Sequence, residues 1–417
     1  MINIKIRFLA IIAVFLLRGV SLSAQDDRLT LKIAVTGPGD ELYFWWGHMA
    51  LVVEDTAKGT SLFYDWGVFS FEEEDFFVDF AFGRLIYLCA VSSAERNFRR
   101  YIETNRDITV YTLNLPPEVE EKIKRLVEDN VRPENRAYEY HHFYQNCSTR
   151  IRDILDVAVN GQFKQEFGNA PGRYTLRQHV RRHTWFSPFM DWILNFLMGQ
   201  DIDVPITIWD EMFLPSEVGE RIKDFSYIDE NGATRKLVSA IEVLNRSVNR
   251  PQVLDVPRRQ WDRELAAGLF MAAAFVFFQF LQRRKPFLGR ALFGLSQSAI
   301  GLFWGIAGLV LFFMTFFTNH DYTYHNANVI FVNPLLLIAV PCGILYAFSK
   351  NEKKRFISES VLRCLWTYVF LGGVLTIVIK LFPGFYQQNQ VTQALVLPSA
   401  FILSRQMETV KQFLNKR

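Results

Sequence analysis

Long apolar runs fill the last third of the chain, whereas apolar and polar positions alternate in the first part. Four of these runs reach or approach the ~20 residues that a membrane-spanning helix needs, over 265–281, 291–317, 329–349 and 361–382. A weaker apolar run covers 391–404. This pattern predicts an α-helical membrane bundle within residues 262–417, with about five spans.

The positive charges between these runs predict how the chain crosses the membrane. Lys and Arg are frequent in 282–290, in 350–363 and in the C-terminal tail, whereas 318–328 and 382–390 contain neither. Loops rich in Lys and Arg stay on the cytoplasmic side. The pattern therefore places 25–260 and the two loops without Lys or Arg outside an inner (cytoplasmic) membrane and the tail inside. Five spans satisfy this parity, and four do not.

The first 24 residues have the pattern of an export signal. Lys5 and Arg7 precede the apolar run 8–17, and small residues follow at 21–24. An apolar run this short is typical of a signal peptide rather than of a span. Residues 1–24 are therefore predicted to be a signal peptide, and residues 25–260 a periplasmic domain.

The exported part combines strand and helix patterns. Residues 29–35 carry an apolar side chain at every second position, which predicts a half-buried strand. Further strands are predicted over 48–54, 61–66, 84–92 and 108–115. Helical spacing of apolar residues begins after Pro116–Pro117 and again after Asn146. We expect an α+β domain with a small, mostly antiparallel sheet and helices packed on it.

The composition fits a mixed membrane and exported chain and excludes other classes. Of the 417 residues, 50% are hydrophobic and 15% aromatic, while only 21% are charged. The net charge of +3 is small, and no basic stripe with interleaved aromatic residues occurs, so no nucleic-acid partner is expected. No Cys-x-x-Cys or His-Glu-x-x-His motif and no Gly-rich phosphate loop occurs. We therefore expect neither a metal nor a cofactor.

A single cysteine stands where a thiolate would be favoured. Asn146 is a typical N-cap residue, which places Cys147 in the first turn of the predicted helix. The positive end of the helix dipole favours the thiolate form there. His48, at the start of a predicted strand, serves as general base if the fold brings it close to the sulfur. Together these two residues predict a thiol nucleophile with its base.

The remaining groups of such a site have candidates nearby. Asp65, on the neighbouring predicted strand, is the carboxylate that we expect to orient the imidazole, and Tyr64 is the alternative. Tyr144 and the backbone amide of Cys147 are candidate donors to an oxyanion. Asn146 completes the predicted catalytic set.

The predicted outer loop 318–328 is densely polar. His320, His325, Asn326 and Asn328 lie within it at the edge of the membrane. Polar groups near membrane depth are costly unless they are used. Two interpretations stay open: these residues line a binding site that faces the exported domain, or they form an ordinary solvated loop.

Aromatic residues gather in three further segments, over 42–46, 69–82 and 185–198. Burial in the core explains most Phe residues in proteins, and we expect core packing for the first two segments. The third segment is too short to span a membrane. It either lies in the membrane interface, where Trp and Phe are favoured, or packs in the core.

The order of a strand histidine followed by a cysteine at a helix start resembles circularly permuted papain-like enzymes. Lecithin retinol acyltransferase-like enzymes, which have a similar Asn-Cys motif, and NlpC-like enzymes belong to this group. The whole chain more closely resembles a family first described as a domain of unknown function and now called Lnb. The stretches that carry this resemblance are 46–51, 64–69, 144–150, 213–215 and 326–334.

The resemblance implies a lipoprotein N-acyltransferase. Such an enzyme transfers an acyl chain from a phospholipid, through a cysteine thioester, to the N-terminal cysteine amine of a diacylated lipoprotein. The roles that carry over are Cys147 as nucleophile and His48 as base. The expected partners are the phospholipid donor, the lipoprotein acceptor and the membrane itself.

Two other functions remain open from the residues. One is a membrane-tethered thiol hydrolase, such as a cell-wall amidase or peptidase. A soluble murein enzyme needs one anchor rather than five spans, which disfavours this alternative. The other is a non-catalytic receptor in which Cys89 and Cys147 form a disulfide, since both would lie in an oxidising compartment.

Overall fold

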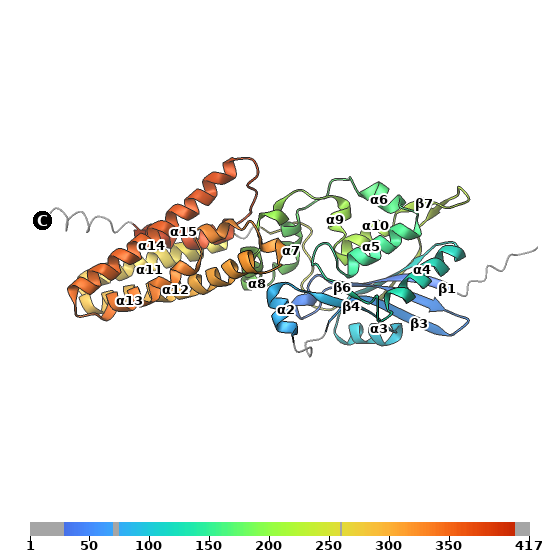
Figure 1. Ribbon diagram of the computed structural model, residues 1–417, viewed down its shortest axis with the longest axis horizontal. Helices are drawn as coiled ribbons and strands as arrows, with labels where there is room; N and C mark the ends of the chain where they lie inside the picture. The colour runs from blue at the N-terminus through green and yellow to red at the C-terminus, as the bar shows by residue number, and fades with distance from the viewer. Residues whose placement is uncertain (1–28, 70–74, 259–260, 405–417) are drawn as a thin grey trace, which may run out of the picture. The chain divides into compact units, whose positions relative to one another are not determined.

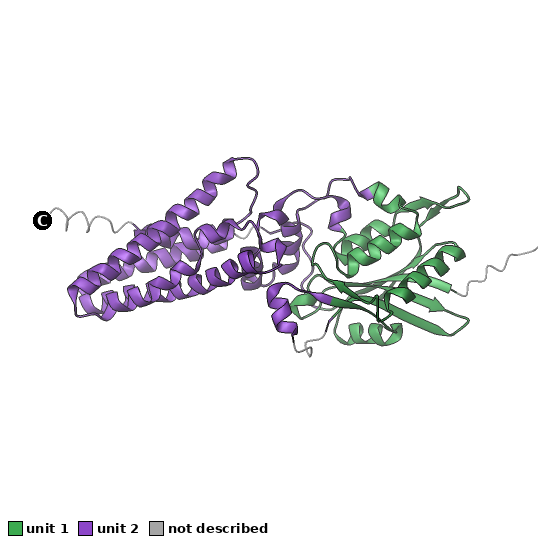
Figure 2. Cartoon of the chain, viewed as in Figure 1, with its two compact units in different colours: residues 1–68, 87–166, 212–248 green, residues 69–86, 167–211, 249–417 purple. Residues whose placement is uncertain are grey.

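The computed structural model describes residues 29–69, 75–258 and 261–404. The predicted signal peptide and the C-terminal tail lie outside these residues. Within the described residues the chain folds into two compact units (Figure 2). Unit 1 comprises 1–68, 87–166 and 212–248, and unit 2 comprises 69–86, 167–211 and 249–417. Segments 69–86 and 167–211 therefore pack with the membrane part, although both precede the boundary near 260 that the sequence suggested.

Unit 1 is built on a seven-stranded sheet with the strand order β6-β4-β3-β2-β1-β5-β9 (Figure 1). The central pairings, from β4 through β3, β2, β1 and β5 to β9, are antiparallel. The strands are β1 (Leu29–Thr36), β2 (His48–Asp55), β3 (Thr60–Val68), β4 (Ile86–Ser93), β5 (Ile108–Leu113), β6 (Ala137–Glu139) and β9 (Val238–Asn245). A separate hairpin joins β7 (Ser226–Ile228) to β8 (Thr234–Lys236). The predicted α+β class is confirmed.

Helices cover both faces of this sheet (Figure 1). Strand alternation turns one set of apolar side chains toward α3 (Ala94–Glu103), where Phe63, Tyr101 and Val110 share a buried cluster. The opposite set meets α4 (Pro117–Asn130) and α5 (Cys147–Ala158), which pack on β1 and β2. The remaining elements of the unit are η1 (Leu42–Phe44), α6 (Gln162–Phe167) and α10 (Pro215–Ile222). Packing on both faces buries the central strands and fixes their register.

Unit 2 contains the apolar helices. Four stretches are long and apolar enough to cross a membrane, namely Trp261–Arg284 (α11), Pro286–Phe317 (α12), Ala327–Phe348 and Glu352–Leu381. The third contains η4 (Ala327–Ile330), η5 (Pro334–Ile338) and α13 (Ala339–Phe348), and the fourth contains α14 (Glu352–Val378) and η6 (Ile379–Leu381). A shorter apolar helix, α15 (Gln390–Ser404), follows within the described residues. The helical membrane bundle is thus confirmed, and the count of five spans holds approximately.

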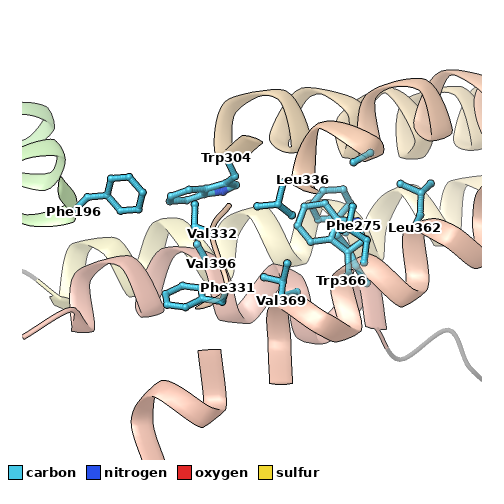
Figure 3. Packing of buried hydrophobic residues seen from close by; sticks show 14 of the residues in the cluster. Phe196, Phe275, Trp304, Phe331, Val332, Leu336, Leu362, Trp366, Val369 and Val396 are labelled. Carbon is cyan, nitrogen blue, oxygen red and sulfur yellow. The ribbon is translucent and has the colours of Figure 1, made fainter. Parts of the chain in front are cut away.

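Shorter helices complete unit 2: α2 (Phe76–Phe82), α7 (Leu176–Thr184), α8 (Pro188–Leu197), η2 (Gln200–Asp203), α9 (Ile208–Glu211) and η3 (Asp321–Thr323). Helix α8 holds most of the third aromatic segment, and it packs on the apolar bundle. Phe196 points toward Trp304 of α12 (Figure 3), and the rings of Trp192 and Trp304 lie 5.6 Å apart. Both residues belong to the same buried cluster as Phe331 and Trp366. The core interpretation of this segment therefore holds for Trp192 and Phe196.

The second aromatic segment departs from its expected place. Phe77 and Phe80 of α2 are 67% and 44% exposed, so the expectation of core packing was wrong for them. In the first segment Trp45 is buried, whereas Leu42 and Tyr43 are exposed. Hydrophobicity alone did not distinguish the buried residues from the exposed ones. An apolar side chain is favoured outside water, but its type does not say whether it packs in the protein core.

Small residues set the distance between two of the apolar helices. A Cβ added to Gly294 of α12 would lie 2.5 Å from the carbonyl oxygen of Gly343 in α13. A Cβ added to Gly343 would lie 2.4 Å from the carbonyl oxygen of Gly294. Helices pack closely in membranes where small residues face each other, because the backbones can then approach. This contact therefore depends on both glycines.

We predict that Gly294→Val lowers the thermal unfolding midpoint of the detergent-solubilised protein, because its side chain pushes α12 away from α13. Overpacking of this kind typically costs about 1–3 kcal/mol. Leu295→Ala is the matched control, since Leu295 is exposed on the same helix turn. Equal midpoints for Gly294→Val and the parent protein would contradict the close contact.

Candidate active site

The first functional side chain stands at the beginning of β2. Gly47 precedes His48 and adopts a φ of +79°, and a Cβ at Gly47 would lie 2.6 Å from the carbonyl oxygen of Thr36. Only glycine fits this turn without strain. The turn delivers His48 to the end of the sheet, where Nε2 of its ring lies 2.6 Å from Oδ1 of Asp65.

The strand register explains the pairing of His48 with Asp65. Asp65 of β3 lies opposite Ala50, two residues beyond His48 on the same face of β2. The neighbouring Tyr64 points to the opposite face and is buried. Asp65 is therefore the group that orients the imidazole in this structure. Its bond to Nε2 leaves Nδ1 of His48 for the thiol.

Cys147 is the first residue of α5, as the sequence predicted. Oδ1 of the N-cap residue Asn146 accepts hydrogen bonds from the amides of Ser148 and Thr149 at 2.9 and 3.0 Å. Thr149 Oγ1 in turn accepts from the Asn146 amide at 2.8 Å, which closes a capping box. The amides of Ser148 and Thr149 are thus both bonded to the cap. Among the described residues, the Cys147 amide is the N–H of the first turn for which the structure shows no acceptor.

The side-chain amide of Asn146 also ties the helix start to two other segments. Its Nδ2 donates to the carbonyl of His142 at 2.8 Å and to the carbonyl of Phe213 at 2.9 Å. Asn146 is buried, so these bonds are shielded from water. The residue acts as a positioning group that fixes where Cys147 stands, and the segment around Phe213 contributes its backbone to that task.

The electrostatics favour an imidazolium–thiolate pair. Burial alone would raise the pKa of Cys147, but the charge and hydrogen bonding of His48, aided by the backbone N–H of Met49, outweigh it and lower the pKa. Burial likewise opposes a charged His48, yet the Asp65 carboxylate and the Cys147 thiolate raise its pKa well above the usual value. Each charge thus stabilises the other, as in activated cysteine nucleophiles.

A residue that the sequence reasoning missed lies beside this pair. Tyr138 of β6 lies beneath Arg150, whose guanidinium carbon is 4.6 Å from the centre of the ring. Its hydroxyl is buried without a hydrogen-bond partner among the described residues, and it lies 4.0 Å from where a Cβ of Gly67 would stand. Burial raises the pKa of Tyr138, and the nearby Cys147 thiolate raises it further. The three-residue strand that carries Tyr138 gives no periodic signal, which is why the sequence did not reveal it.

Tyr144, the oxyanion donor suggested by the sequence, has a different environment. Its side chain is 54% exposed, its ring stacks on that of His141 at 4.7 Å, and its backbone amide donates to His141 Nδ1. The role of Tyr144 as a donor stays a prediction.

Cys89 is separate from the reactive group. It is buried on β4, and burial raises its pKa to about 12. Cys89 and Cys147 are both free thiols, so the disulfide on which the receptor alternative rested is not present in the structure. No group of three or more His, Cys, Asp or Glu side chains that could hold a metal occurs within residues 29–69, 75–258 and 261–404.

The polar loop 318–328, for which a binding site and an ordinary solvated loop were both open, belongs to unit 2. Asn326 and Asn328 are buried, and both donate to the carbonyl of Phe196 in α8. Their side-chain oxygens accept from Gln387 and Asn389 respectively. These amides therefore join α8 to the two outer loops. His320 is buried and His325 is exposed beside Asp201, at 2.8 Å. A binding role for these four residues stays a prediction.

The structure therefore combines a sheet domain carrying a thiol, an imidazole and a carboxylate with a bundle of apolar helices. The family model of the Lnb N-terminal periplasmic domain matches residues 21–182, and that of the Lnb transmembrane domain matches residues 265–410. The chain belongs to the Lnb family and is a multi-pass membrane protein with a periplasmic N-terminal domain. No curated protein and no solved structure gives a significant match.

We predict that Cys147 reacts with iodoacetamide with a pH inflection below the usual thiol value of 9.0, because its lowered pKa keeps the thiolate present at lower pH. The raised pKa of His48 keeps its imidazolium present above 6.5. His48→Ala removes that charge and should move the inflection upward. Mass spectrometry of the individual cysteine peptides provides the measurement.

Cys89 is the internal control for this experiment. Its pKa of about 12 should keep it unlabelled at neutral pH in the folded protein. An inflection for Cys147 that is the same with and without His48 would show that the imidazole does not activate the thiol.

Proposed function

We propose that this protein is a lipoprotein N-acyltransferase that uses Cys147 as its nucleophile. The observation that carries the proposal is that Cys147 opens α5, which packs on the strand of His48, while Asp65 holds the His48 ring at 2.6 Å. The same chain also carries apolar helices long enough to cross a membrane. The donor is a phospholipid, and the acceptor is the N-terminal cysteine amine of a diacylated lipoprotein. Both substrates are anchored in the bilayer, which is consistent with a catalytic protein held there by several helices.

The first half of the reaction forms a thioester. The Cys147 thiolate attacks the carbonyl carbon of a phospholipid ester and forms a tetrahedral oxyanion. When the oxyanion collapses, the ester C–O bond breaks and the imidazolium of His48 gives its proton to the leaving oxygen. Lysophospholipid departs, the acyl chain stays on Cys147, and His48 is neutral. Asp65 holds the ring in place throughout.

The second half transfers the acyl chain to an amine. Neutral His48 takes a proton from the attacking amine as the new C–N bond forms, and the C–S bond breaks to restore the thiolate. A terminal α-amine suits this step, because its pKa of ~7.7–8 leaves a useful neutral fraction at physiological pH. The products are an N-acylated lipoprotein and the imidazolium–thiolate pair, so the cycle closes with all protons accounted for.

Two donors are assigned to the oxyanion in this mechanism. One is the backbone N–H of Cys147, for which no hydrogen-bond acceptor is found among the described residues. The other is the Tyr138 hydroxyl, which is buried and unpartnered and lies near both Gly67 of β3 and Arg150 of α5. An unpaired buried hydroxyl costs free energy unless something uses it. The oxyanion would accept a hydrogen bond from the Tyr138 hydroxyl, and it exists only during the reaction.

The function is tested by incubating the purified protein in phospholipid vesicles with a synthetic diacylated lipopeptide that has a free N-terminal cysteine amine. We predict that the lipopeptide gains the mass of one acyl chain on that amine. Cys147→Ala should abolish the gain, whereas Cys89→Ser should largely preserve it. The same lipopeptide with an acetylated amine is the control substrate and should not change.

An absence of acyl gain with the wild-type protein would overturn the proposal. Release of free fatty acid without acylation of the amine, or cleavage of cell-wall peptides, would instead favour the thiol hydrolase alternative.

We further predict that Tyr138→Phe lowers the turnover of a soluble ester such as p-nitrophenyl butyrate by roughly 10²-fold, as loss of one oxyanion donor typically does. Alkylation of Cys147 by iodoacetamide forms no oxyanion, so its rate should stay close to that of the parent protein. The change keeps the ring that contacts Arg150.

Tyr144→Phe is the matched control, because it removes the hydroxyl of the other candidate donor. Loss of ester turnover in Tyr144→Phe, with normal turnover in Tyr138→Phe, would transfer the role to Tyr144.

A further inference from the structure

Helix α2 exposes apolar side chains that a water-facing helix would avoid. Phe77, Val78 and Phe80 are 67%, 54% and 44% exposed within a helix of seven residues. The polar face carries Asp79, which pairs with Arg84 at 3.6 Å. A patch of large apolar residues on such a short surface element indicates contact with something other than water.

The backbone of α2 is fixed to the loop that follows α12. The Asn319 amide donates to the carbonyl of Phe82 at 2.8 Å, and His320 Nε2 donates to the carbonyl of Phe80 at 2.9 Å. Tyr322 donates its hydroxyl proton to Nδ1 of the same imidazole, at 2.9 Å. Burial lowers the pKa of His320, which fits this neutral form with one donor and one acceptor nitrogen.

Close packing reinforces this attachment. A Cβ on Gly83, which has a φ of +76°, would lie 2.8 Å from the backbone of Asn319 and His320. The ring of Phe82 packs on that of Phe313 in α12, with centroids 5.5 Å apart. Helix α2 is therefore held against the C-terminal end of α12.

The end of α12 lies at the surface of the membrane by its length. The helix has 32 residues, which at ~1.5 Å per residue make it about 48 Å long. The hydrocarbon core is only ~30 Å thick, so the last turns reach the headgroup region. Phe312, Phe316 and Phe317 are exposed there. Phe is among the residues that interfacial helices bury at the boundary between headgroups and acyl chains.

We propose that α2 is an interfacial helix that inserts Phe77, Val78 and Phe80 into the phospholipid bilayer on the periplasmic side. The end of α12, to which α2 is attached, exposes Phe312, Phe316 and Phe317 as further apolar side chains. The exposed side chains of α2 contact the bilayer itself, because α2 is attached to the end of a membrane-spanning helix at the level of the lipid headgroups.

The position of α2 in the chain gives this contact a consequence. It lies in the connection between β3, which carries Asp65, and β4. Along the chain, the strand that carries Asp65 is therefore followed by the helix that we place in lipid. Resting on the proposed function, this means that α2 contacts the same bilayer that supplies the donor phospholipid.

Spin labels test the immersion without any reference to activity. We would label Phe77→Cys and Phe80→Cys, each in a background where Cys147, Cys342 and Cys364 are replaced by Ala, in phosphatidylcholine vesicles. Both labels should be more accessible to dissolved oxygen than to a water-soluble nickel chelate. Leu309→Cys on α12 is the lipid reference and Ile102→Cys on α3 is the water reference, since both side chains are about half exposed.

Labels at 77 and 80 that match the nickel accessibility of Ile102→Cys, while Leu309→Cys reports lipid, would overturn the proposal. The Leu309 label also verifies that each preparation has inserted. In a second experiment, Phe77→Ser should slow acyl transfer from vesicle phospholipid several-fold and leave turnover of a soluble ester unchanged. If wild-type protein transfers no acyl chain while the labels report lipid, the proposed function fails and the interfacial helix stands.

Discussion

The candidate site depends on one charge, the imidazolium of His48, held between the Asp65 carboxylate and the Cys147 thiol. Desolvation works against a charged histidine and against a thiolate, and each would be neutral if it were buried alone. Together they reverse both shifts, so that the pKa of His48 rises and that of Cys147 falls. The carboxylate at 2.6 Å from Nε2 helps to make this reversal possible and leaves Nδ1 of the ring for the thiol.

The rest of unit 1 holds these three groups in place. The antiparallel register of β2 and β3 puts His48 and Asp65 on one face, and the glycine turn before His48 brings it to the end of the sheet. The capping box of Asn146 then sets the first turn of α5, with the Phe213 carbonyl as a fixed point from a distant segment. Regular backbone hydrogen bonding thus positions reactive atoms that are far apart in the sequence.

Much of this arrangement was predictable, because it follows from local patterns. Two adjacent alternating strands bring His48 and Asp65 together, and an Asn-Cys pair before an amphipathic stretch predicts a capped helix with the thiol in its first turn. Tyr138 was not predictable, because a strand of three residues has no period and its neighbours are set by the whole fold. The edge strand β9 escaped prediction too, since its partner β5 lies far away in the chain.

The polar loop and the aromatic segments show a different limit. Asn326 and Asn328 have the polarity expected of a binding site, yet their amides bond to α8 and to the loop before α15. Phe77 and Phe196 are equally apolar, but one is exposed on α2 and the other is buried in the bundle. Residue type determines the free energy that a side chain gains by leaving water. The fold determines whether that side chain then contacts protein or lipid.

The central claim is that an acyl chain rests on Cys147 between donor and acceptor. A single-turnover chase tests it most directly. Protein is loaded with radiolabelled phospholipid, the donor is removed, and a diacylated lipopeptide with a free amine is added. We expect the label to leave Cys147 and appear on the amine in equal amounts, with the loaded label removable by hydroxylamine beforehand. Label that stays on Cys147 while fresh phospholipid still supports transfer would contradict the account.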